Sequence, residues 1–306
     1  MWAVTGMFQK NSPDAFSSYH PVILFLYFCV VLFFTMFFLH PVLLAISFCS
    51  VFLYSVQLNG RKAIRFNIFC MLPVTVIVSL INPLFSHAGV TILFYLNENP
   101  VTLESIAFGI VSGGAFITVI IAFSCFNKIL TSDKLMYLFG RLIPVLSLMF
   151  SMTLRFVPRY KAQIKKIANA QLCIGMDASH GNLLQRVKNG IQILSILITW
   201  ALENAIETAD SMKARGFGLK GRTSFSVFSW KRRDKTLLAT EAALLFALLL
   251  GLGLGKFESV YFPAIRIAWP EGKSAAFYLA YALFCLLPII VNRRENIVWN
   301  KLKSPD

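Results

Sequence analysis

Ala107–Phe126 reads AFGIVSGGAFITVIIAFSCF, a stretch of 20 residues without one charged side chain. A membrane-spanning helix needs about 20 predominantly apolar residues, because each residue advances an α-helix by about 1.5 Å across a hydrocarbon core about 30 Å thick. This stretch therefore predicts a transmembrane helix.

Five more stretches come close to the same length and apolar character: Pro21–Leu39, Pro41–Val56, Phe66–Phe85, Thr236–Leu254 and Ser274–Val291. The predicted fold class is therefore an all-α polytopic membrane protein with about six transmembrane helices. The first two stretches meet at His40-Pro41, a very tight connection. They form either a helical hairpin or a span followed by a short segment that is tilted or partly re-entrant, and the sequence leaves both open.

The composition of the whole chain excludes most soluble classes. Of its 306 residues, 57% are hydrophobic and 14% are charged, whereas an average soluble domain has about 25% charged residues. An ordinary cytosolic enzyme, a disordered regulator and a disulfide-stapled secreted domain are all disfavoured. The six cysteines stand singly in apolar stretches, so neither a metal site nor a disulfide framework is predicted.

Positive charge predicts the orientation in the membrane. The net charge is +15, and Lys and Arg concentrate on the cytoplasmic side of membrane proteins. With the Arg61–Arg65 cluster placed inside, residues 127–235 also fall inside with their 18 basic residues, whereas residues 86–106 contain none and fall outside. Both termini are then expected in the cytoplasm of a multi-pass protein of the cell membrane.

The chain divides into three predicted regions: an N-terminal membrane region with four apolar segments (1–126), a cytoplasmic region (127–235), and a C-terminal two-helix membrane region with a cytoplasmic tail (236–306). The cytoplasmic region contains two long amphipathic stretches, predicted as helices from Pro144 to about Leu172 and from Asn182 to Lys213. Pro158 is expected to kink or break the first helix, because proline lacks the N–H that the helix needs.

Opposite charges follow the two predicted cytoplasmic helices. Three basic residues lie near one face of the first, and three acidic residues follow i, i+4, i+7 on the second: Arg155, Arg159, Lys166, Glu203, Glu207 and Asp210. These stripes either help the helices to meet where they cross or form two separately solvated faces. Both interpretations stay open.

Both helices end on a glycine. The first ends in Cys173-Ile174-Gly175 and the second in Ala214-Arg215-Gly216. Glycine suits the left-handed position that follows many helices. A guanidinium held at such a tip is suited to pairing with a carboxylate on another protein, because its donors form a planar fork.

At these residues the sequence resembles the transmembrane (T) component of energy-coupling-factor transporters, the ABC-class importers of vitamins and metal ions. The resemblance covers most of the chain, and the similar elements occur in this order: Asn82–Leu84, Thr102–Glu104 with Gly109, Arg155–Pro158, Ala170–Gly175 with Asp177, Met212–Gly216 and Gly221–Phe225. Their order and spacing together are specific, although no single element is.

The resemblance implies a scaffold rather than an enzyme. Two coupling helices would each place an Ala-Arg-Gly-like tip in a groove of one of two cytoplasmic ABC ATPase subunits, which use ATP and Mg²⁺, and the scaffold would hold a small substrate-binding S component in the membrane. This chain is then expected to bind no cofactor or metal and to have no catalytic residues. Ala214-Arg215-Gly216 matches the second tip, whereas Cys173-Ile174-Gly175 stands at the first without its arginine.

Three other functions are weighed against this one. A carrier or ABC permease with its own substrate pathway is disfavoured, because its spans usually contain ionisable residues and the spans here are nearly free of them. A membrane enzyme is disfavoured because no catalytic or metal-binding pattern is present. The basic cluster at 231–235 is more typical of a topology and anionic-lipid anchor than of a nucleic-acid site, so no nucleic acid is expected as a partner.

Overall fold

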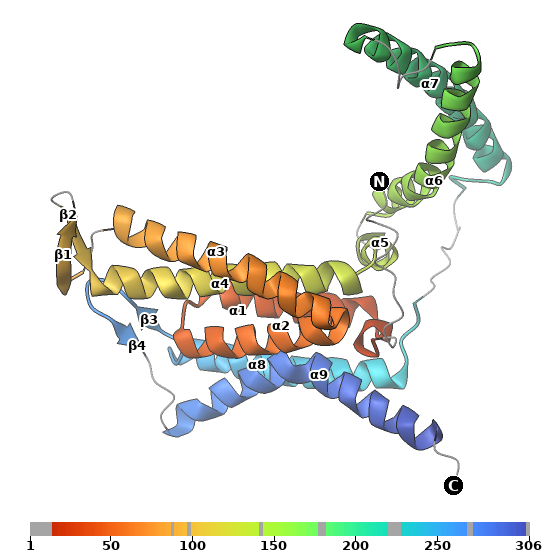
Figure 1. Ribbon diagram of the computed structural model, residues 1–306. Helices are drawn as coiled ribbons and strands as arrows, with labels where there is room; N and C mark the ends of the chain where they lie inside the picture. The colour runs from red at the N-terminus through yellow and green to blue at the C-terminus, as the bar shows by residue number, and fades with distance from the viewer. Residues whose placement is uncertain are drawn as a thin grey trace. The chain divides into compact units, whose positions relative to one another are not determined.

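The computed structural model describes residues 14–86, 89–96, 99–140, 143–176, 182–219, 228–267 and 272–303. The chain forms two compact units (Figure 1), each described here by itself. The six-helix unit comprises Met1–Lys134 and Phe228–Asp306, and the helical-pair unit comprises Leu135–Val227.

In its described residues the first unit has six long helices: α1 (Pro21–Phe37), α2 (Pro41–Asn59), α3 (Arg61–Phe85), α4 (Leu103–Ile129), α8 (Arg232–Gly253) and α9 (Ala275–Lys303). Five of them are long and apolar enough to cross a membrane, and α1 is a shorter apolar helix of 17 residues. The prediction of an all-α polytopic membrane protein is confirmed. The second predicted segment forms the 19-residue α2, which has the length of a span.

Aromatic side chains fill the centre of the six-helix unit. Tyr27 of α1 is fully buried, stacks on Phe284 of α9 with ring centroids 5.6 Å apart, and donates a hydrogen bond to the Cys285 carbonyl at 2.8 Å. The Tyr281 hydroxyl lies 2.5 Å from Ser47 Oγ of α2. These contacts satisfy buried hydroxyl groups that would otherwise be costly in an apolar interior.

α3 and α4 run side by side (Figure 1) and approach closely at a glycine. A Cβ atom added to Gly109 would lie 2.9 Å from the Ser79 carbonyl oxygen, whereas one added to Gly113 would have no neighbour closer than 3.5 Å. The Gly109-x-x-x-Gly113 pattern is therefore a packing face, and the close approach depends on its first glycine.

An N-terminal clasp joins helices that are distant in sequence. The Asp14 carboxylate accepts hydrogen bonds from the Tyr54 hydroxyl at 3.0 Å and from the Asn292 side-chain amide. The Phe16 N–H donates to Asn292 Oδ1 at 3.0 Å, and the Phe16 ring is completely buried. Residues 14–16 thereby tie α2 to α9 through polar contacts.

Several smaller elements were not predicted. They are the antiparallel pairs β1 (Ile92–Leu96) with β2 (Asn99–Thr102) and β3 (Ser259–Val260) with β4 (Arg266–Ile267), the short helix α5 (Ser132–Gly140), and the 3₁₀ turns Phe16–Ser18 and Gly272–Ser274. Both strand pairs lie at the same end of the six-helix unit in Figure 1.

The helical-pair unit consists chiefly of α6 (Pro144–Cys173) and α7 (Leu183–Ala214), which contact each other. Their ends lie within one residue of the predicted ones. Pro158 does not break α6, which continues through it as one helix of 30 residues and bends along its length (Figure 1).

Candidate functional site

The two predicted coupling tips have the same backbone geometry. At the end of α6, Ile174 is the C-cap and Gly175 follows with φ +73°. The Gly175 N–H donates to the Leu172 carbonyl at 3.0 Å, and the Met176 N–H donates to the Gln171 carbonyl at 2.9 Å. This pair of hydrogen bonds is the Schellman arrangement, which satisfies carbonyls that the helix leaves unpaired.

The end of α7 repeats this arrangement. Arg215 is the C-cap, and Gly216 follows with φ +74°. The Gly216 N–H donates to the Lys213 carbonyl at 2.9 Å, and the Phe217 N–H donates to the Met212 carbonyl at 3.0 Å. Ile174 and Arg215 therefore occupy the same position of the same cap. The left-handed glycines expected from the sequence are confirmed.

Both tips present exposed side chains. At the first tip, Leu172, Ile174 and Met176 are exposed, and Ile174 retains 64% of its accessible surface. At the second, Arg215 and Phe217 are exposed. α8 ends in the same kind of cap at Gly255, so the cap alone marks no site. What distinguishes α6 and α7 within the described ranges is that two long helices in mutual contact each end in an exposed tip, one apolar and one cationic.

The contact between α6 and α7 is aromatic and apolar. The Arg159 guanidinium lies over the Trp200 ring, 5.4 Å from its centroid, and Tyr160 meets the same ring edge-on at 5.7 Å. Ile167 of α6 and Leu197 of α7 are buried. Such a cation–π contact contributes about 0.5–1 kcal/mol at an exposed site.

The six charged residues of the predicted stripes are all exposed: Arg155, Arg159, Lys166, Glu203, Glu207 and Asp210. Of these, Arg159 reaches the other helix, and it does so through Trp200 rather than through a carboxylate. Arg155 lies over the ring of its neighbour Phe156. In the part of the chain that the structure describes, no ion pair joins the two stripes, so a contact between their charges stays a prediction.

Sequence reasoning missed Trp200 and Tyr160 as the residues that join the helices. The less exposed side chains of α7 recur at helical spacing: Ile193, Leu197, Trp200, Asn204 and Thr208. This spacing of three or four residues is visible in the sequence and predicts one face of a helix. It was obscured because the other faces of α7 are equally rich in apolar residues.

A second face of α7 is apolar and exposed. Seven side chains at spacings of three or four residues form this exposed α7 stripe, each more than half exposed: Leu184, Val187, Ile191, Leu194, Ile198, Leu202 and Ile206. The stripe extends for about 33 Å at 1.5 Å per residue. An apolar surface of this length marks an interaction with a membrane or with another protein.

Two parts of the predicted resemblance lie outside the described residues, namely Asp177 beside the first tip and the element Gly221–Phe225. Among the residues that the structure does describe, no group of three His, Cys, Asp or Glu side chains could hold a metal ion.

Comparison with known proteins assigns the chain to a family. The family model of the cobalt transport protein CbiQ matches residues 16–225. The chain is 37% identical over 111 residues to the energy-coupling factor transporter transmembrane protein EcfT of Lactococcus lactis, which covers 35% of this chain and 42% of that protein. It is 30% identical over 185 residues to EcfT of Listeria innocua (55% of this chain, 68% of that protein) and 37% identical over 107 residues to EcfT of Bacillus subtilis (34% and 40%). It thus spans about two fifths of the Lactococcus and Bacillus proteins.

Proposed function

Because the chain belongs to the CbiQ family and is a transmembrane (T) component of energy-coupling-factor transporters, we propose that it couples ATP hydrolysis by partner subunits to uptake of a vitamin or metal ion. In this proposal α6 and α7 are the coupling helices. Their tips, Cys173-Ile174-Gly175 and Ala214-Arg215-Gly216, each dock in a groove of one of two cytoplasmic ABC ATPase subunits, which bind ATP and Mg²⁺.

The observation that carries the proposal is the equivalence of the two tips. Each is a Schellman cap with an exposed residue at the C-cap position. A capped end holds its residues in a fixed conformation, and a fixed contact transmits displacement better than a frayed one. Two such tips on helices that contact each other suit a part that receives force from two motors.

The tips differ in chemistry, and the grooves should differ accordingly. Arg215 is suited to a groove with a carboxylate, because a guanidinium forms bidentate hydrogen bonds with it. Ile174, with exposed Leu172 and Met176 beside it, is suited to an apolar groove. The unlike tips therefore favour two unlike ATPase surfaces.

The exposed α7 stripe supports a further part of the proposal, in which the coupling helices hold the S component. An S component is itself a membrane protein and offers an apolar surface. Substrate specificity then belongs to that subunit. With the basic cytoplasmic region facing the ATPases, both termini of this chain lie in the cytoplasm.

The test replaces Arg215 by glutamate in a complex assembled with both ATPases and an S component. Arg215→Glu should abolish ATP-driven uptake and weaken ATPase attachment, because breaking an interfacial charge pair typically costs about 2–5 kcal/mol. Lys213→Glu is the matched control, since it changes the same charge on the exposed end of the same helix. Uptake that persists in Arg215→Glu would refute the coupling role.

The first tip has its own test. Ile174→Arg keeps the cap and adds a charge where an apolar contact is proposed, so it should weaken attachment of one ATPase. Assembly and transport that stay the same or improve would contradict the apolar groove.

The carrier alternative has one structural feature in its favour. Glu241 of α8 is completely buried, and neither carboxylate oxygen has a hydrogen-bond partner within the described ranges. High-affinity binding of substrate by the isolated chain would favour the carrier, and co-purification with two ATPases and a small hydrophobic protein would favour the T component.

A further inference from the structure

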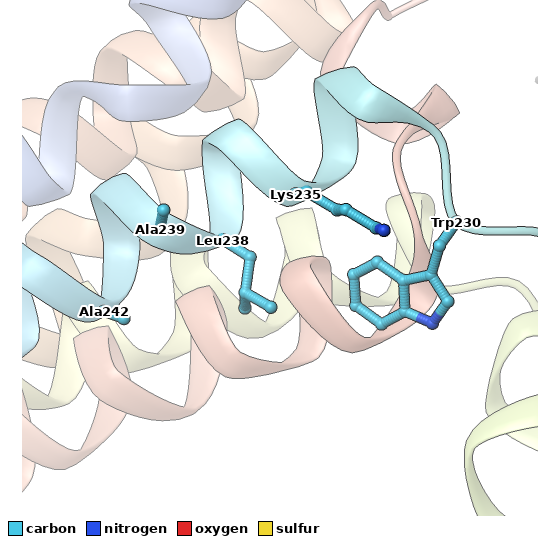
Figure 2. Close-up of a pocket in the computed structure, with 5 residues that line it drawn as sticks. All are labelled: Trp230, Lys235, Leu238, Ala239 and Ala242. Carbon is cyan, nitrogen blue, oxygen red and sulfur yellow. The ribbon is translucent and has the colours of Figure 1, made fainter.

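A pocket lies at the beginning of α8. It has a volume of about 490 Å³ and is lined by Trp230, Lys235, Leu238, Ala239 and Ala242. Figure 2 shows Leu238, Ala239 and Ala242 following one another along α8 and the Lys235 side chain extending toward the Trp230 indole. The pocket thus has a cationic and aromatic mouth and an apolar floor.

Among the residues that the structure describes, none pairs with the charge at the mouth of the pocket. Lys235 is exposed, and within the described part of the chain its ammonium group has no hydrogen bond or ion pair. Lys231 and Arg232 beside it are also exposed. The neighbouring carboxylate, Asp234, is buried and caps the helix by accepting from the Lys231 N–H at 2.9 Å. The mouth is therefore complementary to an anion.

The Trp230 indole is oriented by a stacking contact within the protein. Its indole stacks on the His20 imidazole with ring centroids 3.8 Å apart and an angle of 18° between the planes. His20 is only 4% exposed, whereas Trp230 keeps 42% of its surface accessible. Tryptophan prefers the boundary between hydrocarbon and headgroups, so a half-exposed indole just before a candidate span suits a position at the membrane surface.

The floor continues along a helix that can span a membrane. Leu238, Ala239 and Ala242 belong to α8, a candidate span with only 22% of its apolar window buried inside the protein. Small alanine side chains leave room beside the helix for an acyl chain. A soluble phosphate would make no apolar contact with these residues, and a zwitterionic lipid would be attracted less strongly by the cations than an anionic lipid.

We propose that this pocket is a binding site for a membrane phospholipid with an anionic headgroup. Lys235 pairs with the headgroup, Trp230 contacts the glycerol region, and the first part of an acyl chain lies along Leu238, Ala239 and Ala242. Basic pockets between helices at the cytoplasmic side of a membrane are suited to such headgroups.

The test is native mass spectrometry of the full chain in detergent, titrated with dioleoyl phosphatidylglycerol or with dioleoyl phosphatidylcholine. Lys235→Gln should weaken phosphatidylglycerol binding about fivefold, the equivalent of about 1 kcal/mol for one basic residue, and should leave phosphatidylcholine binding unchanged. Ala242→Phe, which fills the floor but keeps every charge, should weaken binding of both lipids. Lys256→Gln, at the other end of α8, is the matched control and should bind as the unsubstituted chain does.

Three results would overturn the site. The first is equal binding of both lipids by the unsubstituted chain. The second is unchanged phosphatidylglycerol binding in Lys235→Gln or in Ala242→Phe. The third is displacement of phosphatidylglycerol by glycerol 3-phosphate, which would show a site for a soluble anion instead. Thermal unfolding midpoints equal to that of the unsubstituted chain show that a variant is folded, and Lys235→Arg should restore binding.

Discussion

Replacing Gly109 by alanine tests the close contact of α3 and α4. The new Cβ would lie 2.9 Å from the Ser79 carbonyl oxygen, 3.3 Å from Ser79 Cα and 3.2 Å from Asn82 Cβ. Two of these three atoms belong to the backbone and have no rotamer by which to move away. The contact is relieved only if the helices separate locally.

The size of the effect follows from these distances. Carbon and carbonyl oxygen atoms in close contact normally lie about 3.3–3.6 Å apart, so α3 must move by about half an ångström. Overpacking of this kind costs about 1–3 kcal/mol. The same movement lengthens two hydrogen bonds between the helices, from Ser79 Oγ to the Gly109 carbonyl and from Asn82 Nδ2 to Ser112 Oγ, both 3.3 Å.

Thermal unfolding of the purified full chain measures the effect, with Gly113→Ala as the control. Its Cβ would meet Ser79 and Thr75 at 3.5 Å, which is ordinary contact. With an unfolding entropy of about 2.1 cal/mol/K per residue, a loss of about 2 kcal/mol lowers the midpoint of this 306-residue chain by about 3 °C, and we expect this for Gly109→Ala alone. Equal midpoints for the two variants would refute the reasoning.

Other predictions concern single sites, each read from thermal unfolding. Gly190 and Gly175 both have open space for a Cβ, so only the backbone decides the effect of alanine there. Gly190→Ala in α7 should stabilise the protein by about 0.5–1 kcal/mol, whereas Gly175→Ala should destabilise it by about 1–2 kcal/mol, because its backbone is left-handed. The opposite order of the two midpoints would contradict this. Glu241→Met should raise the midpoint, because the buried carboxyl oxygens have no partner among the described residues; a lower midpoint would reveal one. Burial lowers the pKa of His20 below its usual 6.5 against the opposing effect of Asp234, so the folded state binds fewer protons than the unfolded state and stability should fall as the pH drops below 6.5. His20→Asn should remove that pH dependence, and an unchanged dependence would assign it to another group.

The helices that were predicted best are those whose ends are marked by residues typical of helix starts and stops. α6 begins at Pro144 and α7 follows Asn182, and each ends on a glycine. Proline at the first helical position and glycine after the last are local signals, so the equivalence of Ile174 and Arg215 could be inferred without a structure.

Contacts between distant residues could not be predicted in this way. The bond between Asp14 and Asn292 joins residues 278 positions apart, and no local pattern encodes such a pairing. The strand pairs have two to five residues in each strand, which is too short for an alternating pattern to stand out in an apolar chain. The cation–π contact of Arg159 was missed because the charges on the two helices suggested ion pairs.

The exposed α7 stripe bears on how α6 and α7, the proposed coupling helices, gain their rigidity. α6 and α7 bury one narrow face against each other, and in α7 that face includes Asn204, whose buried side-chain nitrogen has no partner in the described part of the chain. The long apolar stripe from Leu184 to Ile206 adds nothing to this contact while it is exposed. Covering it with a membrane or a protein would bury apolar area that the pair leaves exposed, and burial stabilises in proportion to area. We therefore expect α6 and α7 to become rigid only when the proposed transporter complex is assembled. Hydrogen exchange should then be faster for the amide protons of α7 in the isolated chain than in the complex. Equal exchange rates would show that the helical pair is rigid by itself.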